Sequence, residues 1–507
     1  MTGSTVVFAL GPRAVALASL SVPHGAAVHD CTAASWALSD SDGDGEGMSE
    51  KLDELVAPAD RVVIVLEPPL AVSEATASDD EWLDVHTRRV YGIGLAAQRC
   101  ASPPSLLLVS SMSVFESADD TLGIQTNWRR RPSTSPASLG PHLCEFLLEE
   151  FAKENAFGLS VLRLGTVCED AADGARWWTT RDAAVEAIGE MLDDDAGAGV
   201  ANLFSYGRDG SYPLPEHAPL PDTDGPPPSR AVLLGARGMM GPSAAAALAS
   251  AGLDRLIVTD LAEDSDTRDP AQKTRSLGDP VEHSTGGMKR GAENNIDPTV
   301  VEYQVLDVAN NAAVIAAVAE ADVVVNCAVV RGRRALSFSV NVGGTFNAVR
   351  AATNAGHSRF INTGPSGTVV GPGYRQFTQV NESVPPRPGT NLYYITKGLG
   401  HEITRVYSAN FPIFVLTCLF GGVSSAPSPP PGREGMGTGG WSTTLRDCGE
   451  ALRCAVQLPL SKLASRHETF FISPPSPDGW LALGKATSVL GWEPQDRLQG
   501  WFVRPRL

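Results

Sequence analysis

The second half of the chain alternates short apolar runs, rich in β-branched residues, with segments of helical periodicity. The apolar runs are RAVLLGA, RLIVTD, VEYQVLD, DVVVNCA, RFINTG and IFVLTCLF, and helical segments such as GPSAAAALASAG and VGGTFNAVRAATNAG lie between them. This alternation is typical of a parallel sheet covered by helices, so we expect an α/β fold with a doubly wound sheet. Such sheets bind ligands at the carboxyl ends of their strands, which makes those ends the place to look for a site.

A Pro-rich stretch, PLPEHAPLPDTDGPPPSR from Pro213 to Arg230, divides the chain. At 507 residues the chain exceeds the size at which a single core keeps growing. We therefore predict a first domain over 1–212, a linker over 213–229 and a second domain over 230–507. A polar, Gly-rich stretch over 263–298 is interpreted as a surface insertion in the second domain.

Charge and composition exclude several classes of partner. The formal net charge of -18 argues against binding to nucleic acid or to an anionic membrane surface. The one dense basic run, Arg129 to Arg131, is interpreted as a solvated loop. No apolar run approaches the roughly 20 residues of a membrane span, and Gly11-Pro12-Arg13 interrupts the N-terminal stretch, so we expect a cytoplasmic protein. The eight cysteines form no CxxC motif and no Cys/His cluster, which predicts neither disulfides nor a metal site.

A glycine-rich loop, GARGMMG, directly follows the first apolar run of the second half. Gly235, Gly238 and Gly241 permit a tight turn and close approach of a pyrophosphate to a helix N-terminus. Asp260 follows Gly235 by 25 residues, at the end of the next strand, where a carboxylate accepts hydrogen bonds from ribose hydroxyls and disfavours a 2′-phosphate. The loop therefore predicts NAD binding, with NADP the weaker alternative.

Other residues bear on that cofactor prediction. Arg237 inside the loop favours a 2′-phosphate, whereas Glu263 and Asp264 favour NAD again. Asp307 ends the third strand, where it is either a contact for the adenine amino group or the N-cap of the next helix.

One tyrosine of the eight, Tyr393, has a lysine four residues later, Lys397. That spacing places both side chains on one helical face. Because free tyrosine has a pKa of about 10, a nearby ammonium group and an oxidised nicotinamide would be needed to stabilise its phenolate at neutral pH.

Taken in order, these motifs resemble the extended short-chain dehydrogenase/reductases, the NAD-dependent epimerase/dehydratase family, over residues 230–507. The resemblance is carried by GxxGxxG at Gly235, Asp260, Asp307, VVNCAVV at 324–330, NVGGTFNAVRAA at Asn341, SGTVVG at 366–371 and the pair Tyr393/Lys397. It implies a Rossmann-like sheet, with a small substrate lobe in residues 408–507. It also implies a reaction, Tyr/Lys-assisted hydride transfer on a sugar-like hydroxyl or carbonyl substrate of the nucleotide sugar or uronic acid type.

The resemblance also assigns roles to particular residues. Tyr393 would be the acid/base, Lys397 would hold the nicotinamide ribose, and Ser366 would bind the reacting oxygen. Because NTGPSG carries an extra residue and a proline, Thr363 is an alternative to Ser366. Asn341 would order the site or cap a helix. The implied cofactor-binding residues are Gly235, Arg237, Gly238, Met239, Met240, Gly241, Asp260, Asp307, Val308, Cys327, Ala328 and Lys397.

The loop after VVNCAVV carries Arg331, Arg333 and Arg334. Such a cluster at the end of a strand either grips a carboxylate or phosphate or is a solvated loop.

Residues 1–212 repeat the same order of segments in degraded form, so an internal duplication is the simplest account. Leu139 and Leu143 stand where the tyrosine and lysine would be, the loop keeps only Gly11, and Ser111 remains at the serine position. We predict a non-catalytic half that pairs with the second half within one chain and replaces the second subunit of a family homodimer, which leaves the protein monomeric. The segment 135–155 is predicted to pack on the helix around Tyr393.

Two other functions compete with the oxidoreductase or epimerase. A dehydratase would need an acidic residue in NTGPSGTVVG, which has none. The degraded first half also permits a dinucleotide-binding regulator or scaffold.

Overall fold

The computed structural model of the chain divides into two compact units. The first comprises residues 1–217 together with Arg333–Phe338, and the second comprises residues 218–332 and 339–507. The structure describes residues 4–21, 26–31, 46–66, 79–118, 124–169, 176–193, 199–206, 223, 225–261, 300–424, 442–475 and 479–496. Most of the predicted linker and the whole insertion predicted at 263–298 lie outside these ranges. The predicted division into a non-catalytic and a catalytic domain stays a prediction.

A seven-stranded sheet forms the centre of the second unit, in the order β12-β11-β10-β13-β14-β15-β18. All neighbouring strands are parallel. The strands are β10 (Arg230–Leu234), β11 (Arg255–Asp260), β12 (Val301–Val305), β13 (Val323–Asn326), β14 (Arg359–Pro365), β15 (Phe414–Phe420) and β18 (His467–Ile472). Each of the six predicted apolar runs forms one of them. The strand order reverses between β10 and β13, which is where such sheets bind ligands.

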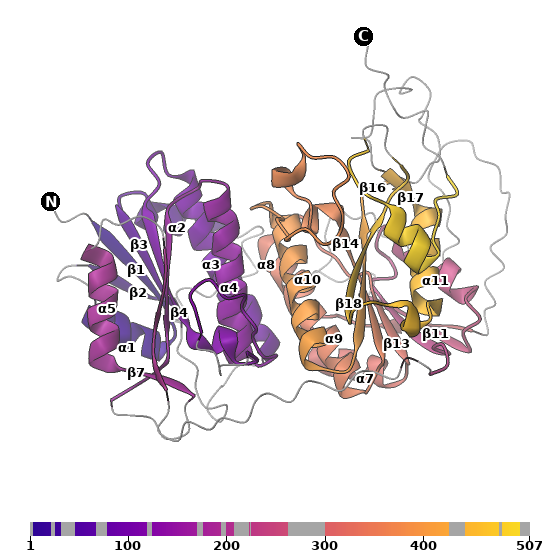
Figure 1. Ribbon diagram of the computed structural model, residues 1–507, viewed down its shortest axis with the longest axis horizontal. Coiled ribbons are helices and arrows are strands. Elements are labelled where there is room, and N and C mark those ends of the chain that lie inside the picture. The colour runs from indigo at the N-terminus through magenta and orange to yellow at the C-terminus, as the bar shows by residue number, and fades with distance from the viewer. Residues whose placement is uncertain are drawn as a thin grey trace, which may run out of the picture. The chain divides into compact units, whose positions relative to one another are not determined.

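Helices cover both faces of this sheet (Figure 1). One face carries α6 (Gly241–Ala249) and α11 (Leu445–Gln457), which pack on each other. The opposite face carries α7 (Asn311–Ala319), α9 (Thr345–Asn354) and α10 (Leu392–Asn410). Because both faces are covered, residues of the central strands are buried on both sides, and Val232, Leu233 and Val324 have no exposed surface. The prediction of an α/β fold with a doubly wound parallel sheet is confirmed for this unit.

Residues 408–507 were predicted to form a small substrate lobe, but part of this range belongs to the main sheet. Strand β18 pairs with β15 there. Helix α11 likewise covers the main sheet. Among the described residues of this range, β16 (Gly422–Ser424) and β17 (Ser442–Thr444) form a separate two-stranded sheet. The correction has a physical reason, since five of the six residues of β18 are buried and need covering layers on both sides.

The first unit contains a six-stranded parallel sheet in the order β2-β1-β3-β4-β5-β8. Its strands are β1 (Thr5–Leu10), β2 (Ala27–Asp30), β3 (Arg61–Leu66), β4 (Ser105–Ser111), β5 (Leu159–Leu164) and β8 (Val200–Leu203). The order matches that of the second unit, except that the described residues form no strand in the position of β12. A three-stranded sheet adds β6 (Thr166–Cys168), β7 (Trp177–Thr180) and β9 (Ser205–Tyr206). The internal duplication stays a prediction.

Two helix layers cover this sheet (Figure 1). Helices α1 (Pro12–Ser21) and α5 (Arg181–Asp193) pack together on one face. Helices α2 (Glu46–Val56), α3 (Asp79–Arg99) and α4 (Pro136–Lys153) cover the other face.

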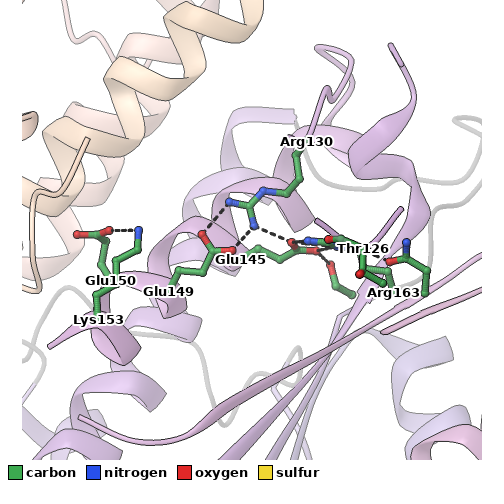
Figure 2. A network of polar contacts seen from close by, with 9 residues as sticks. Thr126, Arg130, Glu145, Glu149, Glu150, Lys153 and Arg163 are labelled. Carbon is green, nitrogen blue, oxygen red and sulfur yellow. Dashed lines mark hydrogen bonds and ion pairs between the residues drawn. The ribbon is translucent and has the colours of Figure 1, made fainter. Parts of the chain in front are cut away.

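A buried ion-pair network ties α4 to the sheet of the first unit (Figure 2). Glu145 has no exposed surface, and its carboxylate accepts hydrogen bonds from Arg163 at 2.8 Å, Arg130 at 2.7 Å and the Ser110 hydroxyl at 2.6 Å. Burial by itself would raise the pKa of Glu145, but the two guanidinium groups lower it to about 2. Arg130 was expected in a solvated loop. That expectation is wrong for Arg130, whose side chain is 12% exposed and pairs with Glu145 and Glu149.

Candidate functional site

A cavity of about 300 Å³ lies in the second unit, at the carboxyl ends of β10, β13, β14 and β15. It therefore sits at the reversal of strand order where the sequence predicts a ligand. Its lining includes Met239, Met240, Cys327, Val329, Arg331, Thr363, Ser366, Arg375, Tyr393, Tyr394 and Lys397.

Helix α10 brings Tyr393 and Lys397 to this cavity. The helix begins after Asn391, whose side chain accepts hydrogen bonds from the backbone N–H groups of Tyr393 and Tyr394 at 3.1 and 3.3 Å. Tyr393 thereby lies in the first turn and Lys397 one turn later, on the same face. The two candidate residues therefore share one cavity, as the sequence predicts.

The environment changes the acidity of both side chains. Burial lowers the pKa of Lys397 from its ordinary value of 10.5 to about 8, an effect that Cys327 opposes and Arg331 adds to. Its Nζ donates a hydrogen bond to the backbone oxygen of Ala328 at 3.5 Å. Burial raises the pKa of Tyr393, and Arg331 acts against that rise.

Ser366 and Thr363 both line the cavity. The Thr363 hydroxyl donates a hydrogen bond to the backbone oxygen of Asn326 at 2.8 Å, so its proton is not available to a ligand. Ser366 lies in a 3-10 turn, η5 (Ser366–Thr368), directly after Pro365. Its hydroxyl makes no hydrogen bond to any part of the chain that the structure describes. Ser366 is therefore better placed than Thr363 to bind a ligand oxygen.

The glycine-rich loop after β10 contains two glycines that packing requires. Gly235 has a φ of +80°, and a Cβ on it would lie 2.6 Å from the backbone nitrogen of Ala328. A Cβ on Gly241 would lie 2.2 Å from the backbone oxygen of Ala236. At Gly238 a Cβ would meet only the Gly235 oxygen, at 3.3 Å, so the remaining space beside it is open. The open side of Gly238 leaves room for a ligand to approach the backbone.

The carboxylate of Asp260, at the end of β11, is hydrogen-bonded to the backbone of Arg237. The Asp260 carboxylate accepts hydrogen bonds from the backbone N–H groups of Arg237 at 2.7 Å and Leu261 at 2.8 Å. The Arg237 guanidinium folds back to donate to the Leu261 oxygen at 3.2 Å. Glu263 and Asp264 lie outside the described residues.

Asp307 is not the N-cap of the following helix. Its carboxylate accepts a hydrogen bond from the N–H of Ala309 at 2.9 Å, whereas the side chain of Asn310 caps α7 by accepting from Ala313 at 3.1 Å. Val308 is buried, and its backbone oxygen accepts from Asn347 at 3.2 Å. Asp260, Asp307, Val308 and Ala328 do not line the cavity, although Ala328 receives the hydrogen bond of Lys397.

Asn341 is likewise no helix cap. It is fully buried in a π-helical turn, η4 (Ser339–Gly344). Its side chain accepts from the N–H of Val330 at 3.0 Å, donates to the Val330 oxygen at 2.7 Å and donates to the Thr396 hydroxyl at 2.9 Å. It therefore fastens the loop after β13 to α10.

The three arginines of the predicted cluster are divided between the two units. Arg331 lines the cavity, and its guanidinium carbon lies 5.1 Å from the centroid of the Tyr393 ring. Arg333 and Arg334 belong to the first unit, where the Arg334 guanidinium lies over the ring of Tyr91. Arg375, which was not predicted from the sequence, also lines the cavity. Its loop carries no recognisable motif, so no local pattern marks it.

Cys327 lines the cavity as an inert thiol, because burial raises its pKa to about 12. Over the described part of the chain, no three His, Cys, Asp or Glu side chains gather as a metal site. Within the same residues, no helix is both long and apolar enough to cross a membrane.

Residues 231–434 match the family model of the NAD dependent epimerase/dehydratase family. The matched range carries β10 to β15 and most of the cavity lining. At the level of the family, this match supports an NAD-dependent enzyme of the epimerase/dehydratase type. A search of curated proteins finds no match to the chain.

Several solved structures resemble part of the chain. A mutated uronate dehydrogenase is 19% identical with a TM-score of 0.40, over 54% of this chain and 84% of its own. A uronate dehydrogenase from Agrobacterium tumefaciens is 22% identical with a TM-score of 0.39, over 53% and 85%. A UDP-galactose 4-epimerase is 17% identical with a TM-score of 0.39, over 54% and 95%.

Proposed function

We propose that residues 230–507 form an NAD-dependent oxidoreductase or epimerase acting on a sugar-like hydroxyl or carbonyl substrate. The observation that carries this proposal is that Tyr393, Lys397 and Ser366 line one cavity bordered by the glycine-rich loop. An acid/base, a cation and a free hydroxyl at the end of a parallel sheet are the groups that proton exchange with a carbonyl or alcohol requires.

The residues around the cavity fit a nicotinamide dinucleotide. The open side of Gly238 and the N-terminus of α6 would receive the pyrophosphate, and Asp260 the adenosine ribose. The bound nicotinamide would accept or donate the hydride. Asp260 favours NAD over NADP, because its carboxylate would repel a 2′-phosphate.

In this proposal each polar side chain of the cavity has one task. Tyr393 exchanges a proton with the reacting oxygen, and Ser366 holds that oxygen by a hydrogen bond. Lys397 would hold the nicotinamide ribose. Its lowered pKa has a cost, because above about pH 8 its amino group loses the charge that would stabilise a phenolate.

The charge of the cavity favours an anionic sugar. Among the lining residues that the structure describes there are three cationic side chains, Arg331, Arg375 and Lys397, and no carboxylate. The chain has a net charge of -18, but this cavity is lined by positive charge. The cavity would therefore attract a negatively charged ligand. A uronic acid or a nucleotide sugar meets this requirement.

Two variants test the proposed function. Titration with NADH and NADPH, followed by energy transfer from tryptophan, should reveal one NADH site that Gly238→Asp abolishes, because the new carboxylate would repel the pyrophosphate. Tyr393→Phe should keep that site and lose about 10²–10⁴-fold in kcat/KM on uronic acids or nucleotide sugars.

The outcome also separates the enzyme from a regulator or scaffold. If the wild-type protein binds NADH but turns over none of these substrates, and Tyr393→Phe changes nothing measurable, the regulator is favoured. If neither cofactor binds saturably, the NAD site itself is refuted. The cytoplasmic location and the monomeric state stay predictions.

A further inference from the structure

The Arg331 side chain lies against the proposed acid/base. Its guanidinium carbon is 5.1 Å from the centroid of the Tyr393 ring, and both side chains line the same cavity. Arg331 reaches this place from the loop after β13, whereas Tyr393 comes from the first turn of α10. Two elements far apart in sequence thus bring a cation to the phenol.

Hydrogen bonds hold the backbone of that loop in position. Val330, the residue before Arg331, exchanges two hydrogen bonds with the Asn341 side chain, at 3.0 and 2.7 Å. Asn341 in turn donates to the hydroxyl of Thr396, the residue before Lys397, at 2.9 Å. These buried hydrogen bonds connect the loop that carries Arg331 to the helix that carries Tyr393. They fix the distance between the loop backbone and the helix.

Tyr393 has two cationic neighbours that differ in how long they keep their charge. Burial lowers the pKa of Lys397 to about 8, so this side chain loses its proton before a phenol would ionise. An arginine stays protonated throughout that range. The titratable and charged side chains that line the cavity around Tyr393 are Arg331, Arg375, Tyr394, Lys397 and Cys327.

Of these neighbours, Arg331 is the one that opposes the effect of burial on the pKa of Tyr393, while Tyr394 adds to it. We propose that Arg331 is a positioning residue that stabilises the phenolate of Tyr393, including at pH values where Lys397 has lost its charge. This inference rests on the proposed function for its catalytic meaning. Its physical content, an effect of one side chain on the ionisation of another, does not depend on turnover.

The test measures ionisation of Tyr393 directly. Tyrosinate absorbance is followed against pH in the full chain, and the difference between a protein and its Tyr393→Phe counterpart isolates this one residue. Arg331→Met should move the Tyr393 midpoint upward by about one pH unit, because Arg331 is exposed at the cavity mouth and solvent screens part of its field. Arg331→Lys keeps the charge and should retain most of the wild-type midpoint.

Arg375→Met is the matched control. Arg375 is also an exposed arginine of the cavity, and it does not contribute to the pKa shift of Tyr393. Equal midpoints in wild type, Arg331→Met and Arg375→Met would overturn the proposal. So would the absence of a Tyr393 transition in wild type below the pH at which the chain unfolds, as judged by circular dichroism.

The kinetic readout then separates this proposal from the proposed function. In the oxidative direction, the rise of kcat/KM with pH should shift upward in Arg331→Met together with the absorbance midpoint. A shifted midpoint in a protein without turnover would uphold the effect of Arg331 and refute the enzyme. If Tyr393→Phe abolishes turnover but Arg331→Met leaves the Tyr393 midpoint unchanged, the enzyme is upheld and the effect of Arg331 is refuted.

Discussion

The burial of Lys397, the lysine proposed to hold the nicotinamide ribose, opposes the stability of the fold. Its side chain is only 4% exposed, and burial lowers its pKa from 10.5 to about 8. The charged form is thus less stable in the folded chain than in the unfolded one, by about 3 kcal/mol at neutral pH.

Replacing Lys397 should therefore stabilise the protein while removing activity. We expect Lys397→Met to raise the free energy of unfolding by about 1–3 kcal/mol at pH 7, measured by urea denaturation. The gain should shrink as the pH rises from about 8 to 10.5, because wild-type lysine then loses its proton in the folded state first. Lys462→Met, on an exposed side chain, serves as the control and should change little. A destabilised Lys397→Met would contradict the assigned cost of burial.

At the same scale, the sequence reveals some site residues and hides others. The Tyr393/Lys397 pair was predicted from its helical spacing together with the motifs upstream of it, and both residues line the cavity. Asn341 and Asp307 could not be told from helix caps, because their partners, Val330, Thr396 and Ala309, are fixed only by the tertiary fold. Arg375 was missed for the same reason.

Among the secondary-structure elements, α4 depends on a single carboxylate. Glu145 is fully buried between Arg130 and Arg163, so Glu145→Gln would leave the buried Arg163 without its counter-ion and Arg130 with Glu149 alone. Removal of one partner from a buried pair costs about 3–5 kcal/mol. We expect that loss at pH 7, measured as faster hydrogen exchange in α4, β4 and β5. The matched variant Glu149→Gln, with a side chain 31% exposed, should cost about 1 kcal/mol or less.

The pH dependence of this effect has a definite sign. Because the pKa of Glu145 falls from 4.5 to about 2 on folding, its carboxylate stabilises the fold above pH 4.5. That contribution is lost as the pH falls from 4.5 towards 2, so wild type and Glu145→Gln should converge in acid. Equal exchange rates in the two proteins at pH 7 would show that the network contributes no net stability.

Elements were predictable where the signal is local. Strands β10 to β15 are short runs rich in β-branched residues, and each was expected in the place where it occurs, although β12 is largely exposed. The position of β18 beside β15 was not, because pairing between strands about 50 residues apart leaves no local pattern. The burial of Arg130 could not be predicted from the sequence either, because a run of three arginines, Arg129 to Arg131, is typical of a solvated loop.

For the whole molecule, the first unit is the part to which the proposed function assigns no chemistry. Over the described residues its sheet has the strand order of the second unit without a counterpart of β12, Leu139 and Leu143 are fully buried apolar residues, and the Ser111 side chain accepts a hydrogen bond from the N–H of Ser113 as a helix cap. The prediction that this unit is non-catalytic and supports the second half would account for apolar residues at these positions.

This support can be tested within the full chain. If the first unit stabilises the second, Glu145→Gln should lower the temperature at which NADH binding is lost, although Glu145 is remote in sequence from the NAD site. Glu149→Gln should leave it near the wild-type value. In addition, residues 228–507 expressed alone should self-associate on a sizing column or lose activity, because they lack the partner surface. A fragment that is soluble, monomeric and fully active, together with an unchanged NADH midpoint in Glu145→Gln, would show that the two halves are energetically independent.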